Sequence, residues 1–391
     1  MGRGPRVVIS GIGLVTGLGP DAASTWSAVR EGRCGLHLVD VPGVGPVIAC
    51  PSPLEGTSDL DPTMSIQPRA EDEALDSARV GADLGGYRPE RVAALIGMSK
   101  GRVRGLSQAT RPDWLESWPG DGPRLTRSRR PFLGPSSAPV AACATGLVAV
   151  LQGAEMVRRG DCDMALAGAV DASLDPLLVA AFQNMKVLAR HDDATRAVRP
   201  WDRDRRGFVI GEGAALFVLE RADRALARGA APLVEVAGGA LGSDAYHITD
   251  LNPDPANLAG LIGRALDNAG AKPEEVDHIN VHGTATRSND PLECRAIRMA
   301  FGAHADRISC SASKAQIGHL LGAAGAAELA LTCLAIRDGF VPPTLNLDDP
   351  DPACDLDGTP HEGRPRDVRV ALKFSLGFGG HLAVAVLKRW D

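Results

Sequence analysis

The chain has 391 residues, 44% hydrophobic and 23% charged, so it is long enough to bury one large core or two packed halves. Its formal net charge is −6 and aromatic residues make up only 4%, which argues against binding nucleic acid through a basic field or through base stacking. No window reaches the roughly 18 consecutive apolar residues of a membrane span. We therefore predict a cytoplasmic protein that binds neither nucleic acid nor membrane.

Short apolar runs alternate with helical patterns along the chain, which is typical of an α/β fold. The expected strands are, in chain order, Val7–Ser10, Val92–Ile96, Met164–Gly168, Ala214–Leu219, Leu233–Ala240, His278–Val281, Val368–Phe374 and Leu382–Leu387. Helices are expected at Gly146–Arg159, Ala256–Asn268 and Ala323–Arg337. A charged, alanine-rich stretch at Arg221–Ala231 is the best internal boundary, and it divides the chain into residues 1–225 and 226–391.

The eight cysteines are scattered and form no C-x-x-C pair, so we expect no structural metal site and mostly reduced, buried thiols. Cys143 differs from the rest because it stands in Ala-Ala-Cys-Ala-Thr-Gly. A strand-like segment, Pro139–Ala142, precedes a helix that is expected to begin near Ala144. A sulfur beside a helix N-terminus favours the thiolate, and the same amides could hold an oxyanion. The alternative is a structural cysteine between small neighbours.

Two histidine segments are further candidates. His282 follows a predicted strand and precedes Thr284 and Thr286, which suggests a loop at the sheet edge where α/β proteins bind ligands; the alternative is a capped turn with a packed histidine. Lys314 and His319 precede a small-residue helix that carries Glu328 in an apolar setting. A buried carboxylate needs a partner, and Lys314 is an available one; the alternative is that all three are solvated.

A glycine-rich segment, Ser375–Gly380, lies between the last two predicted strands and presents Phe378 in a hairpin. Taken in order, six segments resemble the β-ketoacyl-[acyl carrier protein] synthases, especially the elongating type of bacterial fatty acid synthesis. They are AACATG around Cys143, RPWDRDRRGFVIGEGA at 199–214, SDAYHIT at 243–249, VHGTAT around His282, KAQIGHLLGAAGAAE at 314–328 and SLGFGG at 375–380.

This resemblance implies a thiolase-like fold, in which two similar α/β halves form a five-layered αβαβα arrangement, and a homodimer. It implies that Cys143 is the acyl-accepting nucleophile, that His282 and His319 are the catalytic histidines, and that Lys314 and Glu328 support them. Thr284 and Thr286 would hold the phosphopantetheine arm, while Phe378 and Gly379 belong to the gating loop. The backbone amides of Cys143 and Phe378 would form the oxyanion hole.

The reaction that it implies is a decarboxylative Claisen condensation of an acyl thioester on Cys143 with malonyl-[acyl carrier protein], in fatty acid, specialised lipid or polyketide synthesis. No metal, redox group or other cofactor is expected beyond the phosphopantetheine that the acyl carrier protein brings. The expected partners are the acyl carrier protein, acyl and malonyl thioesters, and a second copy of the chain.

Some positions depart from the family pattern. Lys100 falls near the apolar end of the acyl pocket, where a charge suits a long alkyl chain poorly. The segment at about 105–131 is shortened and rich in arginine, and either contacts an acidic carrier or is a solvated loop. Arg287, Phe374 and Leu382 replace a usual proline and two usual asparagines.

Two other functions are therefore considered. One is a chain-length-factor-like subunit that shapes the pocket of a partner without condensing, although Cys143 argues against it. The other is an acyltransferase or hydrolase on the same fold.

Overall fold

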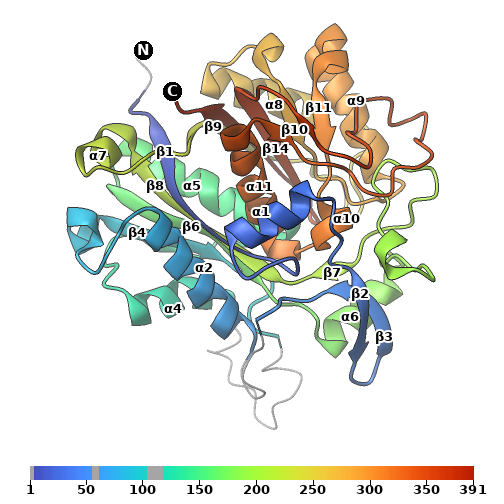
Figure 1. Cartoon of the computed structure of the whole chain (residues 1–391), viewed down its shortest axis with the longest axis horizontal. Coiled ribbons are helices and arrows are strands. Elements are labelled where there is room, and N and C mark those ends of the chain that lie inside the picture. The colour runs from blue at the N-terminus through green and yellow to red at the C-terminus, as the bar shows by residue number, and fades with distance from the viewer. Residues whose placement is uncertain (1–3, 55–60, 104–117) are drawn as a thin grey trace.

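The computed structural model describes residues 4–54, 61–103 and 118–391 (Figure 1). Its strands are β1 Val7–Val15, β2 His37–Val41, β3 Gly45–Cys50, β4 Val92–Gly97, β5 Ser136–Ser137, β6 Met164–Asp171, β7 Ile210–Gly211, β8 Gly213–Arg221, β9 Val234–Ser243, β10 His278–Asn280, β11 Ser309–Ser311, β12 Phe340–Val341, β13 Arg364–Pro365, β14 Val370–Gly377 and β15 His381–Arg389. Its helices are α1 Ala22–Arg30, α2 Thr63–Ser77, α4 Asp121–Arg129, α5 Thr145–Arg159, α6 Pro176–Asn184, α7 Ala222–Ala227, α8 Ala256–Ala269, α9 Asn289–Phe301, α10 Lys314–Ile317 and α11 Ala324–Asp338.

The central sheet has ten strands in the order β11-β10-β14-β15-β9-β1-β8-β6-β4-β5. Its two ends mirror each other. From the outside inward, each half has two parallel pairings (β5-β4-β6 and β11-β10-β14) followed by two antiparallel ones (β6-β8-β1 and β14-β15-β9). The halves join where β1 and β9 pair at only two positions. The chain therefore repeats one α/β topology twice.

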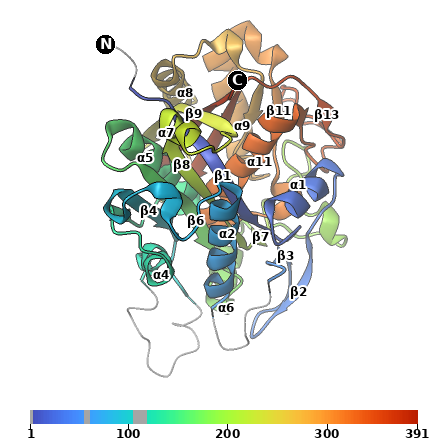
Figure 2. The ribbon, with the colours of Figure 1, turned by 60° about the vertical axis from the view of Figure 1, so that its left-hand side comes forward.

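Helices cover both faces of each half and also fill the space between them. α2 packs on β1, β6 and β8, whereas α8 packs on β9 and β15 beside α9. Between the halves lie α5, against β4, β6 and β8, and α11, against β14 and β8 (Figures 1 and 2). These layers form the αβαβα arrangement of the thiolase-like fold, as the sequence predicts.

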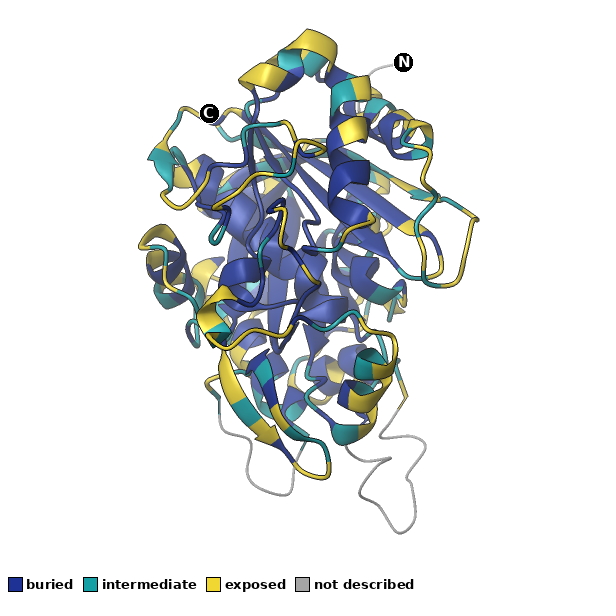
Figure 3. Ribbon diagram, turned by 90° about the vertical axis from the view of Figure 1, so that its right-hand side faces the viewer, coloured by how far each residue is buried: buried dark blue, intermediate teal, exposed yellow. Residues whose placement is uncertain are grey.

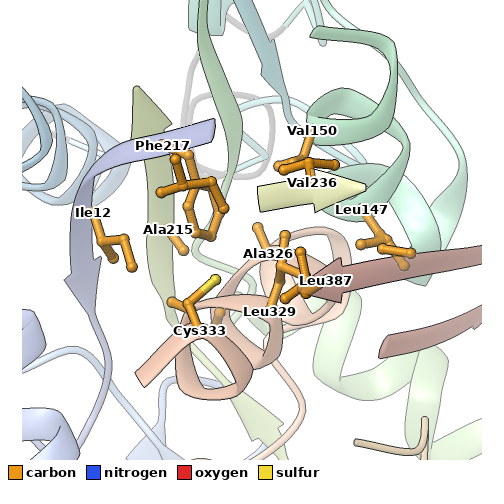
Figure 4. Close-up of a cluster of buried hydrophobic side chains, with 14 of the residues drawn as sticks. Ile12, Leu147, Val150, Ala215, Phe217, Val236, Ala326, Leu329, Cys333 and Leu387 are labelled. Carbon is orange, nitrogen blue, oxygen red and sulfur yellow. The ribbon is translucent and has the colours of Figure 1, made fainter. Parts of the chain in front are cut away.

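The burial of the two inner helices explains their composition. Every residue of α11 from Ala324 to Ile336 is buried, as expected for a helix that is apolar all round. Figure 4 shows Leu329 and Cys333 of α11 in one buried cluster with Phe217 of β8 and Leu387 of β15. Buried residues fill the central layers and exposed ones lie on the outer helices and loops (Figure 3).

The sequence predicts most of these elements, with one error near the nucleophile. Each of the eight expected strands and the three expected helices exists, with ends that shift by a few residues. The strand predicted at Pro139–Ala142 is wrong, because β5 ends at Ser137 and pairs only with Ala94 and Leu95 of β4. Pro139 has no N–H with which to continue that ladder.

Two further features concern the class of protein. Among the described residues, no helix is both long enough and apolar enough to cross a membrane. The eight cysteines are free thiols, and all except Cys34 are buried.

Candidate active site

Cys143 lies in a short 3₁₀ turn, η3 (Ala142–Ala144), that leads directly into α5. The turn holds Ala142 at φ 47°, a left-handed conformation that is costly for a residue other than glycine. Thr145 holds the bend, because its Oγ1 accepts from the Ala141 amide and donates to the Ala142 carbonyl, both at 2.8 Å. The sulfur is thus fixed at the positive end of the α5 dipole.

The β14–β15 hairpin closes over this turn. A Cβ on Gly377 would lie 2.6 Å from the Ala141 carbonyl oxygen and 3.2 Å from the Cys143 nitrogen, so only glycine permits so close an approach. Gly379, at φ 81°, forms the tip, and its amide donates to the Ile248 carbonyl at 2.8 Å. Phe378 is therefore brought next to the backbone of Cys143.

His282 follows β10 at the carboxyl end of the sheet, as the sequence predicts. Its own amide and that of Gly283 donate to the Glu293 carboxylate of α9 at 2.6 and 2.8 Å. Gly283 adopts φ 52°, which lets two consecutive amides point at one carboxylate. Sequence reasoning missed Glu293, although an acidic residue in the buried face of a helix is a signal of such a role.

Behind His282 lies a buried charged cluster. Glu328 Oε1 is 2.6 Å from Lys314 Nζ, and Glu328 Oε2 is 2.6 Å from Lys373 Nζ. Lys314 also donates to the His282 carbonyl and lies 3.5 Å from His282 Nδ1. The predicted Lys314–Glu328 pair is confirmed as a contact. The second lysine was missed, although a lone lysine inside an apolar strand was the available signal.

His319 follows α10 and is fixed by the backbone on both sides. Its amide donates to the Val209 carbonyl at 2.8 Å, and its carbonyl accepts from Gly211 at 2.9 Å. The rings of His319 and His282 lie 5.5 Å apart at 80°, and the Phe208 ring lies 4.8 Å from His319 at 80°. Phe208 therefore sets the plane of the His319 imidazole.

The hydrogen bonds also determine which ring nitrogen carries the proton. The Leu321 amide donates to His319 Nδ1 at 3.2 Å, so that nitrogen is an acceptor. The Lys314 ammonium is the donor group beside His282 Nδ1. Burial, together with nearby ammonium groups, lowers the pKa of both imidazoles well below 6.5. Two neutral rings that accept at Nδ1 must each carry the proton at Nε2.

These residues converge on one cavity of about 580 Å³, which Cys143, His282, His319 and Phe378 line together. Thr284 and Thr286 line the same cavity, with their hydroxyl oxygens 2.9 Å apart. Lys314 and Glu328 lie behind it. Thus residues that are far apart in the chain form one pocket, as the sequence predicts.

Cys143 is not in the ionised state that its place before a helix suggested. Burial raises the pKa of the Cys143 thiol to about 11, while the ammonium groups of Lys100 and Lys314 lower it. Desolvation of the charged form outweighs the cations, because the sulfur is packed against Phe208, Val179 and Leu321. The expectation of a resting thiolate is therefore corrected.

Lys100 does not line the cavity. Its Nζ lies 2.5 Å from Ser99 Oγ and 3.3 Å from Asp171 Oδ2. Asp171 is almost fully buried and also accepts from Ser99 at 2.6 Å and from the Gly322 amide at 3.0 Å. The lysine is thus neutralised in a polar cluster, but its charge still affects the pKa values of Cys143 and His319.

Arginines gather beside the cavity mouth. Arg206 and Arg287 line the cavity itself, and a neighbouring hollow of about 490 Å³ is lined by Arg203, Arg205, Arg287 and Arg295. Two of these are paired, Arg203 with Asp349 and Arg205 with Asp351. Arg129 and Arg130 likewise pair with Glu71 and Asp72 of α2. The predicted arginine patch is therefore partly neutralised where it is described, and Arg111 lies outside the described residues.

Comparison with known proteins agrees with this geometry. Residues 5–225 match the family described as "Beta-ketoacyl synthase, N-terminal domain", and residues 233–348 match "Beta-ketoacyl synthase, C-terminal domain". The chain belongs to the β-ketoacyl synthase family. It is therefore an acyltransferase that forms carbon–carbon bonds, a condensing enzyme.

Relatives and solved structures of this family cover almost the whole chain. The 3-oxoacyl-[acyl-carrier-protein] synthase 2 of Coxiella burnetii is 34% identical over 98% of both chains. The ketoacyl synthase alpha subunit of the tetracenomycin polyketide synthase of Streptomyces glaucescens is 36% identical over 98% of this chain and 97% of that one. A β-ketoacyl synthase from Burkholderia phymatum superposes with a TM-score of 0.89 at 28% identity, covering 99% of this chain and all of the other.

Proposed function

We propose that the chain is a 3-oxoacyl-[acyl carrier protein] synthase that condenses an acyl group on Cys143 with a malonyl group on a carrier protein. The observation that carries this proposal is the convergence of Cys143, His282 and His319 on one cavity, with a proton at Nε2 of each imidazole. The residues of the site then have the following roles.

The first step is acyl transfer to Cys143. The sulfur attacks the carbonyl of the incoming thioester, the new S–C bond forms, and the phosphopantetheine thiol leaves with the proton of Cys143. The amides of Cys143 and Phe378 stabilise the oxyanion, a role supported by the close approach of Gly377 to the Cys143 nitrogen. Because the resting thiol is neutral, the proton must move as the S–C bond forms.

The second step is decarboxylation. A malonyl thioester enters, held along its arm by Thr284 and Thr286. Its C–C bond to the carboxylate breaks, CO2 leaves, and the electron pair becomes an enolate whose oxygen accepts from Nε2–H of His282 and His319. Neutral donors suit this step, because they stabilise the charge without protonating the carbon nucleophile.

The third step joins the two units. The enolate carbon attacks the Cys143 thioester, and the tetrahedral intermediate collapses with loss of the Cys143 sulfur. A 3-oxoacyl group, longer by two carbons, leaves on its carrier. Phe378 and Gly379 act as the gate between the two substrates.

The proposal also covers the carrier protein, the two halves of the chain and the oligomeric state. Arg206 and Arg287, which line the cavity, suit an acidic carrier, and one similar solved structure is described as a type II polyketide synthase acyl-carrier protein in complex with its ketosynthase. The mirrored strand order supports two halves, residues 1–225 with the nucleophile and residues 226–391 with both histidines. A homodimer and a cytoplasmic location stay predictions.

The test separates the three candidate functions. The purified chain is incubated with an acyl carrier thioester and then with malonyl-carrier. We expect an acyl mass on Cys143, release of CO2 and a 3-oxoacyl product. Cys143→Ala should lose the adduct, whereas Cys34→Ala, which removes the one cysteine that is not buried, should keep it. His282→Ala should keep the adduct and lower condensation by about 100- to 1000-fold, the usual cost of one oxyanion donor.

Other outcomes would point elsewhere. An adduct without CO2 release would indicate an acyltransferase or hydrolase. Activity only after addition of a second, related subunit would favour a chain-length-factor-like role, and one neighbouring structure is titled as a ketosynthase with chain length factor. No adduct with any thioester would refute the proposal.

A further inference from the structure

Lys373 is a fully buried lysine that the steps above do not use. It lies in β14, where alternate residues face opposite layers: Leu372, Phe374 and Leu376 pack in the outer core of the C-terminal half. Lys373 therefore points to the inner layer, toward Glu328 of α11. A lysine without solvent exposure is rare unless it is paired, so its contacts indicate its purpose.

Its contacts form a clamp on the segment that carries His282. Lys373 Nζ donates to the Val281 carbonyl at 3.1 Å, while Lys314 Nζ donates to the next carbonyl, that of His282. The two ammonium groups also hold opposite oxygens of Glu328. Two consecutive carbonyls are thus fixed by two cations that share one carboxylate.

The other side of the same segment is held by an anion, since Glu293 accepts from the two amides that follow. The charged and titratable groups that interact with Lys373 are Glu328 of α11, Lys314 of α10, Glu293 of α9, His278 and His282 from β10 and its end, and His319 after α10. The backbone around His282 is therefore held by two lysines at its carbonyls and by Glu293 at its amides.

We propose that Lys373 is a positioning residue for the decarboxylation step: it holds the Val281 carbonyl and one oxygen of Glu328, which leaves Lys314 to hold the His282 carbonyl and to face His282 Nδ1. Without its charge, Glu328 Oε2 would be a buried carboxylate oxygen with no cation, and it would draw Lys314 away from the imidazole. His282 would then lose the donor that keeps its proton at Nε2. This inference rests on the proposed function, which assigns the Nε2–H donor to the enolate.

Loss of the Lys373 charge should slow decarboxylation much more than acylation of Cys143. Acylation of Cys143 depends on the sulfur and on backbone amides, whereas decarboxylation depends on the His282 donor. Burial lowers the pKa of Lys373 to about 8, against the opposing effect of Glu328. The clamp is therefore present below pH 8 and is lost as Lys373 gives up its proton above it.

The experiment compares the two half-reactions in the full-length chain. In Lys373→Met, CO2 release from malonyl-carrier at pH 7 should fall by about 10- to 100-fold, the range expected for a displaced catalytic group, while Cys143 acylation should change less than about threefold. The wild-type decarboxylation rate should decline as the pH rises through 8, and the variant should lack this step. Lys388→Met is the matched control, because Lys388 also donates to backbone carbonyls, those of Ala269 and Gly270, but in the neighbouring strand β15, opposite Val370 at the start of β14.

Chemical rescue separates positioning from a structural role. Lys373→Ala leaves room for a small cation, so ethylammonium should restore CO2 release by at least fivefold and tetramethylammonium should not. Lys373→Gln, which keeps a donor without charge, serves if the other variants do not fold, and it should lose the pH step as well. Equal loss of acylation and decarboxylation, no rescue, or an unchanged pH profile would overturn the inference. A wild-type chain that acylates Cys143 but releases no CO2 would instead refute the proposed function.

Discussion

At the scale of single residues, the site works by keeping charge away from the reacting groups and close to their supports. Both histidines are neutral because they are buried and lie near several ammonium groups. The charges are placed one layer back, on Lys314, Glu328 and Lys373, where each finds a partner within 2.6 Å. This arrangement yields two hydrogen-bond donors that do not act as acids.

Lys100 lies outside the cavity, but its charge is close to the nucleophile. Its ammonium is held by Asp171 and Ser99, and it is near enough to Cys143 to lower the pKa of the thiol. Burial of an alkyl chain against a charge costs desolvation, so we expect short or polar acyl groups to acylate Cys143 faster than long alkyl chains. Lys100→Met should reverse this order, with about a tenfold gain for a ten-carbon acyl carrier, measured by intact mass over time.

The same variant has a second, opposite effect that serves as an internal check. Since Lys100 lowers the pKa of the Cys143 thiol, its removal should raise that pKa further and reduce the thiolate fraction at any pH below it. Alkylation of Cys143 by iodoacetamide at pH 8 should slow by about three- to tenfold. Lys186→Met, which removes an exposed charge at the rim of the cavity, is the control. An unchanged acyl preference in Lys100→Met would exclude this role.

At the scale of elements, the position of Cys143 depends on how closely α5 and α11 approach. A Cβ on Gly146 would lie 2.7 Å from Ala326 Cβ, and one on Gly325 would lie 3.0 Å from Leu147 Cβ. Small residues at this crossing let the two helices meet between the sheets. The crossing places the start of α5, with its nucleophile, beside the turn that follows His319.

Gly146→Ala tests this crossing. The added methyl group meets the backbone of another buried helix, so the free energy of unfolding should fall by about 1–3 kcal/mol, as for other overpacked cores, and the melting temperature should drop by several degrees. Gly263→Ala is the matched control, because Gly263 is also helical but has nothing within 4 Å of the added group. Removal of a flexible glycine there should stabilise the protein by about 0.5–1 kcal/mol. Equal changes in the free energy of unfolding for the two substitutions would contradict the close approach of α5 and α11.

At the scale of the whole molecule, the ten-stranded sheet ends at β5 beside the nucleophile, and no described residue forms a further strand there. β5 is the last strand at that edge, both of its residues are exposed, and Val140 just after it is 50% exposed. Unpaired edge strands with apolar neighbours are sites where a second chain can pair. This edge is the place where the predicted homodimer would form.

Light scattering on the eluting peak of a sizing column tests this prediction. We expect a mass near twice 40.8 kDa for the wild type and near 40.8 kDa for Val140→Asp. Leu226→Asp is the control, since Leu226 is equally exposed at 53% but lies on α7, far from this edge. A wild-type mass of one chain at every concentration would exclude the homodimer.

The sequence by itself determined the class of fold, the order of the main strands, and the identity of the residues around Cys143, His282 and His319. These features are local, because alternation, helical spacing and short motifs are written in neighbouring positions. Where a local signal was ambiguous, the prediction failed: Pro139–Ala142 has the composition of a strand but lies beyond the last ladder bond of β5.

Only the tertiary structure decided the electrostatics of the site. The pKa of Cys143, the proton position on His282, the Lys100–Asp171 pair and the clamp by Lys373 all depend on groups that lie far apart in the chain. Desolvation and Coulomb interactions sum over whatever the fold brings within a few ångströms. A sequence pattern can identify such groups. The distances between them are set by the folded structure, in which the two halves pack around α5 and α11.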